Sequence, residues 1–221
     1  AFILNKNSDQ IFPLTKVNPY GYSISQTHVY DIEIIDGEYW LATGDGITKI
    51  ANNGDISYLG SSKNSQPIKL STTSTLKQVG DIVWIGTFKG LAIYDLKNQQ
   101  FISAGQKSAE LTGLTQKIIF SIQPDSNGSV WVGTYSGLFR YQPTLSAVRT
   151  FENRKEFQKA SISSTIWAIN EDANGDLWFV TQNEGLGKFD RRYLHGQPDI
   201  GLSRYGYPGS LSCKSAAVLG K

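Results

Sequence analysis

The sequence predicts an all-β protein that is built from short antiparallel strands. Three observations predict this fold: a tryptophan-centred motif occurs four times, apolar and polar residues alternate within each copy, and Asp, Asn and Gly stand where strands should turn. Four short strands that recur every 44 to 47 residues are typical of the blades of a β-propeller. We therefore expect a β-propeller fragment with four complete four-stranded blades and a partial blade at each end.

The repeated motif is Trp-x-x-Thr, followed by a glycine and an apolar residue. Its copies begin at Trp40, Trp84, Trp131 and Trp178, which lie 44, 47 and 47 residues apart. The glycines of the four copies are Gly46, Gly90, Gly137 and Gly185. One such sheet cannot bury both of its faces, so we expect the tryptophans to fill the space between neighbouring blades. These eight residues are therefore interpreted as structural.

The elements of a blade follow from the motif in order. An inner strand precedes the tryptophan and shows an apolar-x-x-apolar pattern at residues 29–32, 76–79, 119–122 and 166–169. A hairpin turn rich in Asp, Asn and Gly comes next, and the Trp-x-x-Thr segment forms the second strand. The glycine leads into a third strand, as at residues 91–94. A fourth strand closes the unit, near Phe101 and Phe151 in two copies.

This register sets the expected boundaries. Complete blades are expected at about 25–70, 71–114, 115–160 and 161–200, and partial blades at 1–24 and 201–221. The first partial blade should hold the two outer strands, around residues 2–5 and 11, and the second an inner strand at 211–220. These end pieces either form one incomplete blade together or leave edges that invite self-association.

Composition and charge exclude several classes of function. The net charge of +2 gives no electrostatic footprint for nucleic acid or an anionic membrane surface. No apolar run approaches the roughly 18 residues that a membrane span needs, so a membrane link is expected only through segments outside this chain. The single cysteine, Cys213, cannot form an intrachain disulfide. His28 and His195 have no partner at metal-ligand spacing, so we expect no metal, no cofactor and no catalytic residue.

The chain resembles the two-component regulator propeller repeat over roughly residues 1–190 and more weakly in the tail, and the two stretches that carry the resemblance are residues 119–141 and 166–186. Both combine an Asp-x-Asn-Gly turn, at Asp125 and Asp172, with the tryptophan strand and a Gly-Leu step. The second copy departs from the pattern, because its first turn is only Gly80-Asp81. The resemblance implies the periplasmic sensor region of an inner-membrane bacterial protein. It also implies that the output module, a histidine kinase or a GGDEF-type diguanylate cyclase, lies outside these residues.

If the propeller binds a ligand, its candidate residues lie on the entrances to the inner strands and on the turns between second and third strands. These segments share one face around the central channel of a propeller. The candidates are His28, Tyr30, Asp45, Lys89, Lys117, Tyr135, Trp167, Asn183 and Glu184. Such a mixture of aromatic and polar groups suits a sugar or another small polar molecule. The alternative is that they are solvated turn residues, and that Trp167, which shares its register with Tyr30 and Phe120, serves blade packing.

Three further alternatives concern a metal, an enzyme and a scaffold. Residues 172–176 suggest a calcium loop, but their glycine is fourth rather than sixth, so turn chemistry explains the run better. The spacing Asp-x-x-Gly-x-x-Trp is similar to that of streptogramin lyases, which suggests a lyase or glycan-active propeller. Such an enzyme would need a complete ring and a histidine at the channel mouth, and this chain has only two histidines. A pure protein-interaction scaffold would differ from a sensor only by lacking a small-molecule site.

Overall fold

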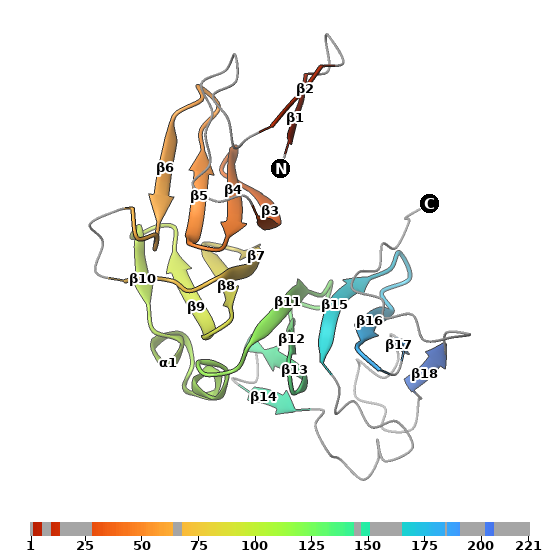
Figure 1. Ribbon diagram of the computed structural model, residues 1–221. Coiled ribbons are helices and arrows are strands. Elements are labelled where there is room, and N and C mark those ends of the chain that lie inside the picture. The colour runs from red at the N-terminus through yellow and green to blue at the C-terminus, as the bar shows by residue number, and fades with distance from the viewer. Residues whose placement is uncertain are drawn as a thin grey trace. The chain divides into compact units, whose positions relative to one another are not determined.

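The structure, a computed structural model, describes residues 2–5, 10–13, 28–63, 68–143, 147–150, 165–183, 185–190 and 202–205. Within these residues it contains four antiparallel sheets of four strands and one of two strands (Figure 1). The predicted all-β fold is thus confirmed. The chain divides into two compact units, Ala1–Phe101 (unit 1) and Ile102–Lys221 (unit 2).

Unit 1 contains a two-stranded sheet and two four-stranded sheets. The two-stranded sheet pairs β1 (Phe2–Asn5) with β2 (Gln10–Pro13), as the register of the first partial blade predicts. The next sheet comprises β3 (Val29–Ile35), β4 (Glu38–Thr43), β5 (Gly46–Ile50) and β6 (Ile56–Leu59). The following sheet comprises β7 (Thr73–Val79), β8 (Ile82–Thr87), β9 (Gly90–Asp95) and β10 (Gln100–Ile102). Strand order follows chain order, so each sheet is a simple meander.

Unit 2 contains the other two four-stranded sheets. One comprises β11 (Ile119–Pro124), β12 (Val130–Thr134), β13 (Gly137–Gln142) and β14 (Ala147–Thr150). The other comprises β15 (Ile166–Glu171), β16 (Leu177–Thr181), β17 (Leu186–Phe189) and β18 (Leu202–Tyr205). Because β18 belongs to this last sheet, the sheet extends past the expected boundary at residue 200. The inner strand expected at 211–220 lies outside the described residues.

Two short helical segments connect β10 to β11, and the sequence analysis did not predict them. They are α1 (Ala104–Lys107) and η1 (Ala109–Leu114). Ser103 and Gln106 form a capping box: the Ser103 hydroxyl accepts from the Gln106 N–H at 3.1 Å, and the Gln106 side chain accepts from the Ser103 N–H at 2.7 Å. Leu111 and Leu114 are buried. The Ser-x-x-Gln spacing of Ser103 and Gln106 is the sequence pattern that could have predicted the start of α1.

The inner strand of every four-stranded sheet has the same irregularity. Pairing with the second strand shifts by one residue near the start of the inner strand, which leaves one residue bulged out of the ladder. The bulged residues are Tyr30, Ser74, Phe120 and Trp167. The pairing of Thr73 with Thr87 aligns residues 73–76 with 29–32, so the alignment that used 76–79 was wrong. The search for an apolar-x-x-apolar pattern gave the wrong alignment, because a buried threonine, Thr73, holds the position equivalent to Val29.

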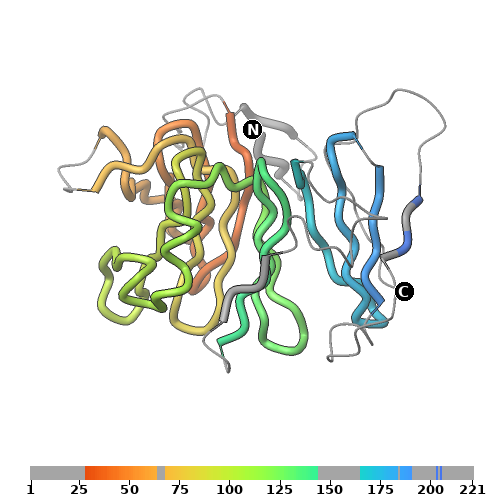
Figure 2. Tube along the Cα trace, turned by 90° about the horizontal axis from the view of Figure 1, so that it is seen from below, coloured from red at the N-terminus to blue at the C-terminus, as the bar shows by residue number. Residues whose placement is uncertain are grey.

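The hydrophobic core lies between stacked sheets within each unit (Figure 2). In unit 1 the first sheet contributes Trp40, Ala42 and Ile47, which pack on Leu76, Val83 and Ile85 of the second. In unit 2 Trp131 and Leu138 pack on Ile169, Leu177, Phe179 and Phe189. Each interface therefore joins the tryptophan-bearing face of one sheet to the aliphatic face of the next. Trp40, Trp84 and Trp131 are at most 2% exposed.

Candidate functional site

The turns between second and third strands are fixed to the entrances of the inner strands. The first residue of the turn donates its N–H to the residue that precedes the inner strand: Phe88 to Thr72 at 3.0 Å, Tyr135 to Ile118 at 2.9 Å, and Gln182 to Thr165 at 2.9 Å. This contact places the bulged residue and the turn at the same end of the sheet. The sequence analysis expected ligand-binding residues at this end.

The glycines of the repeat make these turns possible. Gly46, Gly90, Gly137 and Gly185 all have positive φ, between 71° and 136°. The threonine that ends each second strand also supports the turn, because its hydroxyl donates to the carbonyl of this glycine at 2.8 to 3.0 Å. A side chain at the turn tip is therefore presented by a rigid frame.

In unit 1 three aromatic side chains gather at this end. The rings of His28 and Tyr30 are stacked with centroids 6.4 Å apart, and the Phe88 ring lies 6.3 Å from that of Tyr30. Tyr30 is 49% exposed and Phe88 41% exposed. The exposed Lys89 follows Phe88 in the same turn. His28, Tyr30 and Phe88 form the unit 1 aromatic cluster, a solvent-facing surface, and the cationic Lys89 is next to Phe88 in sequence.

Phe88 was missed by the sequence analysis. It follows the Trp-x-x-Thr threonine directly, which is the position that Tyr135 occupies in the next copy. Because Tyr135 was a candidate, its equivalence with Phe88 could have predicted Phe88 as a candidate too.

Asp45 lies on the β4–β5 turn, but its carboxylate is occupied by neighbours. It accepts hydrogen bonds from the Ser61 hydroxyl at 2.8 Å, the Ser62 N–H at 2.9 Å and the Ser62 hydroxyl at 2.7 Å. Burial by itself would raise the pKa of Asp45, yet these hydrogen bonds and the nearby Lys63 charge together lower it. Asp45 thus ties the segment after β6 to the turn.

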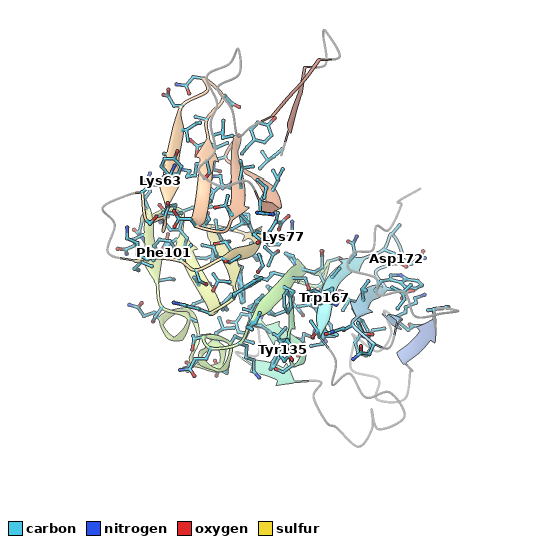
Figure 3. All side chains as sticks on the ribbon, viewed as in Figure 1. Lys63, Lys77, Phe101, Tyr135, Trp167 and Asp172 are labelled. Carbon is cyan, nitrogen blue, oxygen red and sulfur yellow. The ribbon has the colours of Figure 1, made fainter. Side chains whose placement is uncertain are left out.

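In unit 2 one candidate, Trp167, packs on a neighbouring ring, whereas Tyr135 lies on an exposed turn (Figure 3). The half-buried Trp167 ring lies 4.5 Å from that of Phe120, which joins the bulges of β15 and β11. Tyr135, on the β12–β13 turn, is 62% exposed. Lys117 donates to the Ser136 hydroxyl at 3.1 Å and lies 4.9 Å from the Phe139 ring centre. Trp167 therefore packs between neighbouring sheets, as its alternative interpretation states.

The remaining candidates lie on the β16–β17 turn. Asn183 is exposed there, and Glu184 lies outside the described residues. The candidates are thus divided between the two units. Of the group in unit 1, the structure brings His28 and Tyr30 together, and Phe88 with them. Lys89 is exposed next to Phe88 in the same turn, and the Asp45 carboxylate is bound within its own turn.

The opposite end of the unit 2 sheets is organised by two aspartates. One Asp172 oxygen accepts from the N–H groups of Asn174 and Asp176, both at 2.9 Å, and the other accepts from the Trp178 indole at 2.8 Å. Asp125 makes the same three contacts in its own turn, with Trp131. Burial alone would raise the pKa of Asp172, but its donors and Lys188 lower it overall.

These contacts bear on the calcium alternative, because backbone and indole donors occupy the oxygens that a cation would need. No group of three or more His, Cys, Asp or Glu that could hold a metal occurs in the part of the chain that the structure describes. A cavity of about 190 Å³ lies between the two turns. Glu171, which lines it, already accepts from the N–H and the hydroxyl of Ser126, at 2.8 and 2.6 Å.

Comparison with known proteins bears out the resemblance of these repeats. Residues 113–136 and 161–183 match the family model described as "two component regulator propeller". These two stretches of the chain therefore match the two-component regulator propeller repeat. No curated protein sequence matches the chain.

Several longer proteins of known structure contain a region with the fold of this chain. The extracellular domain of the hybrid two-component system BT3049 from B. thetaiotaomicron superposes with a TM-score of 0.62 at 18% identity, over 97% of this chain and 26% of that one. For BT4673 of the same organism the TM-score is 0.66 at 19% identity, over 93% and 25%. Virginiamycin B lyase from Staphylococcus aureus gives 0.57 at 17% identity, over 81% and 56%. The chain thus spans about a quarter of the two extracellular domains.

In the ranges that the structure describes, no helix is long and apolar enough to cross a membrane.

Proposed function

We propose that this chain is part of an extracytoplasmic, periplasmic sensor region that binds a small polar ligand and catalyses no reaction itself. The observation that carries the proposal is the pairing of regulator propeller repeats with an exposed aromatic cluster at the turn end of unit 1. The two structural neighbours that are extracellular domains of hybrid two-component systems support the sensory role.

The unit 1 aromatic cluster has the chemistry that a sugar or a similar polar ligand requires. Exposed rings at Tyr30 and Phe88 can stack on the apolar face of a sugar ring. His28 and Lys89 can supply hydrogen-bond donors to hydroxyl or carboxylate groups beside it. The β8–β9 turn positions Phe88 and the β3 bulge positions Tyr30, which limits the conformational entropy that these two rings lose on binding. A site of this kind would bias an output module by stabilising one arrangement of the sensor region.

A thermal-shift screen with monosaccharides, oligosaccharides and amino acids tests the proposal. A ligand that binds only the folded state, supplied at about 100 times its Kd, should raise the melting temperature by about 5 to 10 °C. Tyr30→Ala and Phe88→Ala should each weaken binding by about tenfold, measured by calorimetric titration, because each removes one stacking surface.

Tyr135→Ala is the matched control, because it removes an exposed aromatic from the equivalent turn of unit 2. If this change alone weakens binding, the sensor proposal stands but the site is wrong. If no compound shifts the melting temperature, the small-molecule site is refuted and a scaffold that signals through protein contacts is favoured.

A lyase is the second candidate, because virginiamycin B lyase shares the fold. In the residues that the structure describes the one histidine is His28, and it is exposed beside Tyr30. Turnover of a streptogramin by the chain, abolished in His28→Ala, would replace the sensor proposal with the enzyme. We expect no turnover.

A further inference from the structure

The unit 1 aromatic cluster is built from two neighbouring sheets. Tyr30 belongs to the bulge of β3 in the first of these sheets, whereas Phe88 lies on the β8–β9 turn of the second. The Phe88 N–H donates to the Thr72 carbonyl at 3.0 Å, which holds Phe88 at the entrance to β7. The distance of 6.3 Å between the Tyr30 and Phe88 ring centroids therefore depends on how β3 is placed relative to β7.

One carboxylate joins these two strands beside the cluster. Asp31 follows Tyr30 directly, and one of its oxygens accepts from the Thr75 hydroxyl and from the Leu76 N–H, both at 2.9 Å. Its other oxygen accepts from the Ile32 N–H, also at 2.9 Å. The Asp31 carboxylate is thus bound to β3 and β7 at once. We call Asp31, Thr75 and Leu76 the Asp31 clamp.

Both β7 donors of the clamp are buried, so they require an acceptor. Thr75 and Leu76 are at most 5% exposed. In the described part of its sheet, β7 is an end strand that pairs only with β8, and Asp31 accepts from an N–H on the other edge of β7. A buried donor without an acceptor costs free energy, so these two donors hold Asp31 in place.

Unit 2 joins its inner strands in a different way. The ladder pairing makes Ser121 of β11 equivalent to Asp31, and its hydroxyl has no hydrogen-bond partner among the described residues. The bulge aromatics Phe120 and Trp167 instead pack on each other, with ring centroids 4.5 Å apart. In unit 1 the next bulge residue is Ser74, which offers no ring. A polar clamp thus stands in unit 1 where ring packing stands in unit 2.

We propose that Asp31 is a positioning residue for the ligand site at the unit 1 aromatic cluster. It holds Tyr30 at a set distance from Phe88, so that both rings can contact one ligand. Three donors already occupy its carboxylate, so Asp31 acts through the two rings and does not bind the ligand itself. The effect of Asp31 on affinity rests on the proposed function, whereas its effect on the ring geometry does not.

Nuclear Overhauser contacts between the Tyr30 and Phe88 rings test the geometry without a ligand. The cross-peak between these rings is assigned by its absence in Phe88→Ala. Asp31→Ala should lose this cross-peak, because three donors lose their acceptor and β3 is no longer bound to β7 beside the cluster. If circular dichroism shows that Asp31→Ala is folded and its cross-peak equals that of the wild type, the proposal is wrong.

Glu33→Ala is the matched control. Glu33 lies two residues further along β3 and accepts from the Lys77 ammonium group of β7 at 2.6 Å. Its removal therefore loosens the same pair of strands at a greater distance from the cluster. The cross-peak should persist in Glu33→Ala. Its loss there as well would mean that general docking of the two sheets sets the ring distance, which overturns a specific role for Asp31.

Thr75→Val covers the case in which Asp31→Ala does not fold. This substitution keeps the size of the side chain and removes one of the two β7 donors of the clamp. It should therefore weaken the cross-peak between the Tyr30 and Phe88 rings. An unchanged cross-peak in Thr75→Val would then overturn the proposal.

The panel of monosaccharides, oligosaccharides and amino acids from the thermal-shift screen tests the effect on affinity. For a compound that binds the wild type, Asp31→Ala should raise the Kd by about tenfold, and Glu33→Ala should leave it unchanged. Equal Kd values for the wild type and for an Asp31→Ala variant that has lost the cross-peak would refute the positioning role. If no compound binds the wild type, the proposed function fails, and the cross-peak alone decides whether Asp31 sets the ring geometry.

Discussion

Asp172 shows how one side chain can fix a turn and anchor a strand. It accepts from two backbone N–H groups of its own turn and from the indole of Trp178, six residues further on. Replacing it removes the partner of half-buried donors, which costs more than the net value of a hydrogen bond. The same arrangement at Asp125 indicates that the Asp-x-Asn-Gly turn of this repeat is structural.

Asp172→Asn is therefore expected to destabilise the chain by about 1 to 3 kcal/mol at pH 7, because the amide N–H₂ would face the indole N–H. The folded-state pKa of Asp172 lies below its ordinary value of 3.8. Its contribution is therefore complete above that value and is lost as pH falls through the lower, folded-state pKa. Urea unfolding at a series of pH values should show the difference between wild type and variant shrinking below about pH 4.

Asp81→Asn is the control, since Asp81 is an exposed residue of the β7–β8 turn. It should change stability by less than about 0.5 kcal/mol. A difference between wild type and Asp172→Asn that stays constant down to pH 2 would contradict the assigned role.

At the scale of elements, the turns between second and third strands depend on backbone space as well as on conformation. Gly46 has φ of 71°, and a Cβ there would lie 2.8 Å from the backbone of Leu59 and Gly60. Gly80 has φ of 60° in the β7–β8 turn, but a Cβ there would meet nothing within 4 Å. Substituting alanine at each glycine therefore separates the free-energy cost of positive φ, which both positions share, from that of a steric clash, which only Gly46 adds.

We expect Gly80→Ala to cost about 1 kcal/mol, the penalty of a left-handed conformation in an L-residue. Gly46→Ala should cost about 2 kcal/mol more, because the backbone of the next strand must move. Urea unfolding followed by tryptophan fluorescence measures both. Equal effects of the two substitutions would show that the β4–β5 turn relaxes freely.

The inner-strand bulge is the element that links fold to candidate site. It takes Tyr30, Phe120 and Trp167 out of the ladder in the same register. Where the next sheet supplies a second bulge aromatic, as for Phe120 and Trp167, the rings pack on each other. Where it supplies Ser74, whose hydroxyl donates to the Gly86 carbonyl, Tyr30 stays exposed and meets a turn residue, Phe88. The residue at the bulge of the next sheet thus decides whether a bulge aromatic packs between sheets or stays exposed to solvent.

At the scale of the whole molecule, the two four-stranded sheets within each unit bury one face on each other. Each unit has its own hydrophobic cluster, and in such repeat architectures stability is close to a sum of local terms. Phe189 illustrates this: it is fully buried in unit 2, with its ring 5.3 Å from Phe179 and 5.8 Å from Trp131.

Phe189→Ala should destabilise unit 2 by about 3 to 5 kcal/mol through the cavity that it leaves. Native-state hydrogen exchange should therefore show loss of amide protection in β11–β17, with little change in β3–β9. A matched substitution in unit 1, Ile85→Ala, should give the reverse pattern, since Ile85 of β8 is fully buried in the unit 1 cluster. Equal loss of protection in both units would mean that the chain unfolds as one cooperative body.

The sequence by itself determined the all-β repeat and the position of each tryptophan strand. It could do so because turn residues, period-two alternation and the glycine with positive φ are local requirements that each copy must meet. The capping pair at Ser103 and Gln106 was equally local but was overlooked.

Only the tertiary structure decided the register of β7, the assignment of β18, and which candidates meet. From its residue type alone, Thr73 does not look like the first buried position of an inner strand. Its pairing with Thr87 and its full burial show that it is. Asp45 resembles a ligand-binding residue until Ser61 and Ser62 are placed beside it. Ile32 resembles its buried counterparts in sequence, and only the accessible surface shows that its side chain is 51% exposed. These properties depend on contacts between residues far apart in the chain, which a local sequence pattern does not encode.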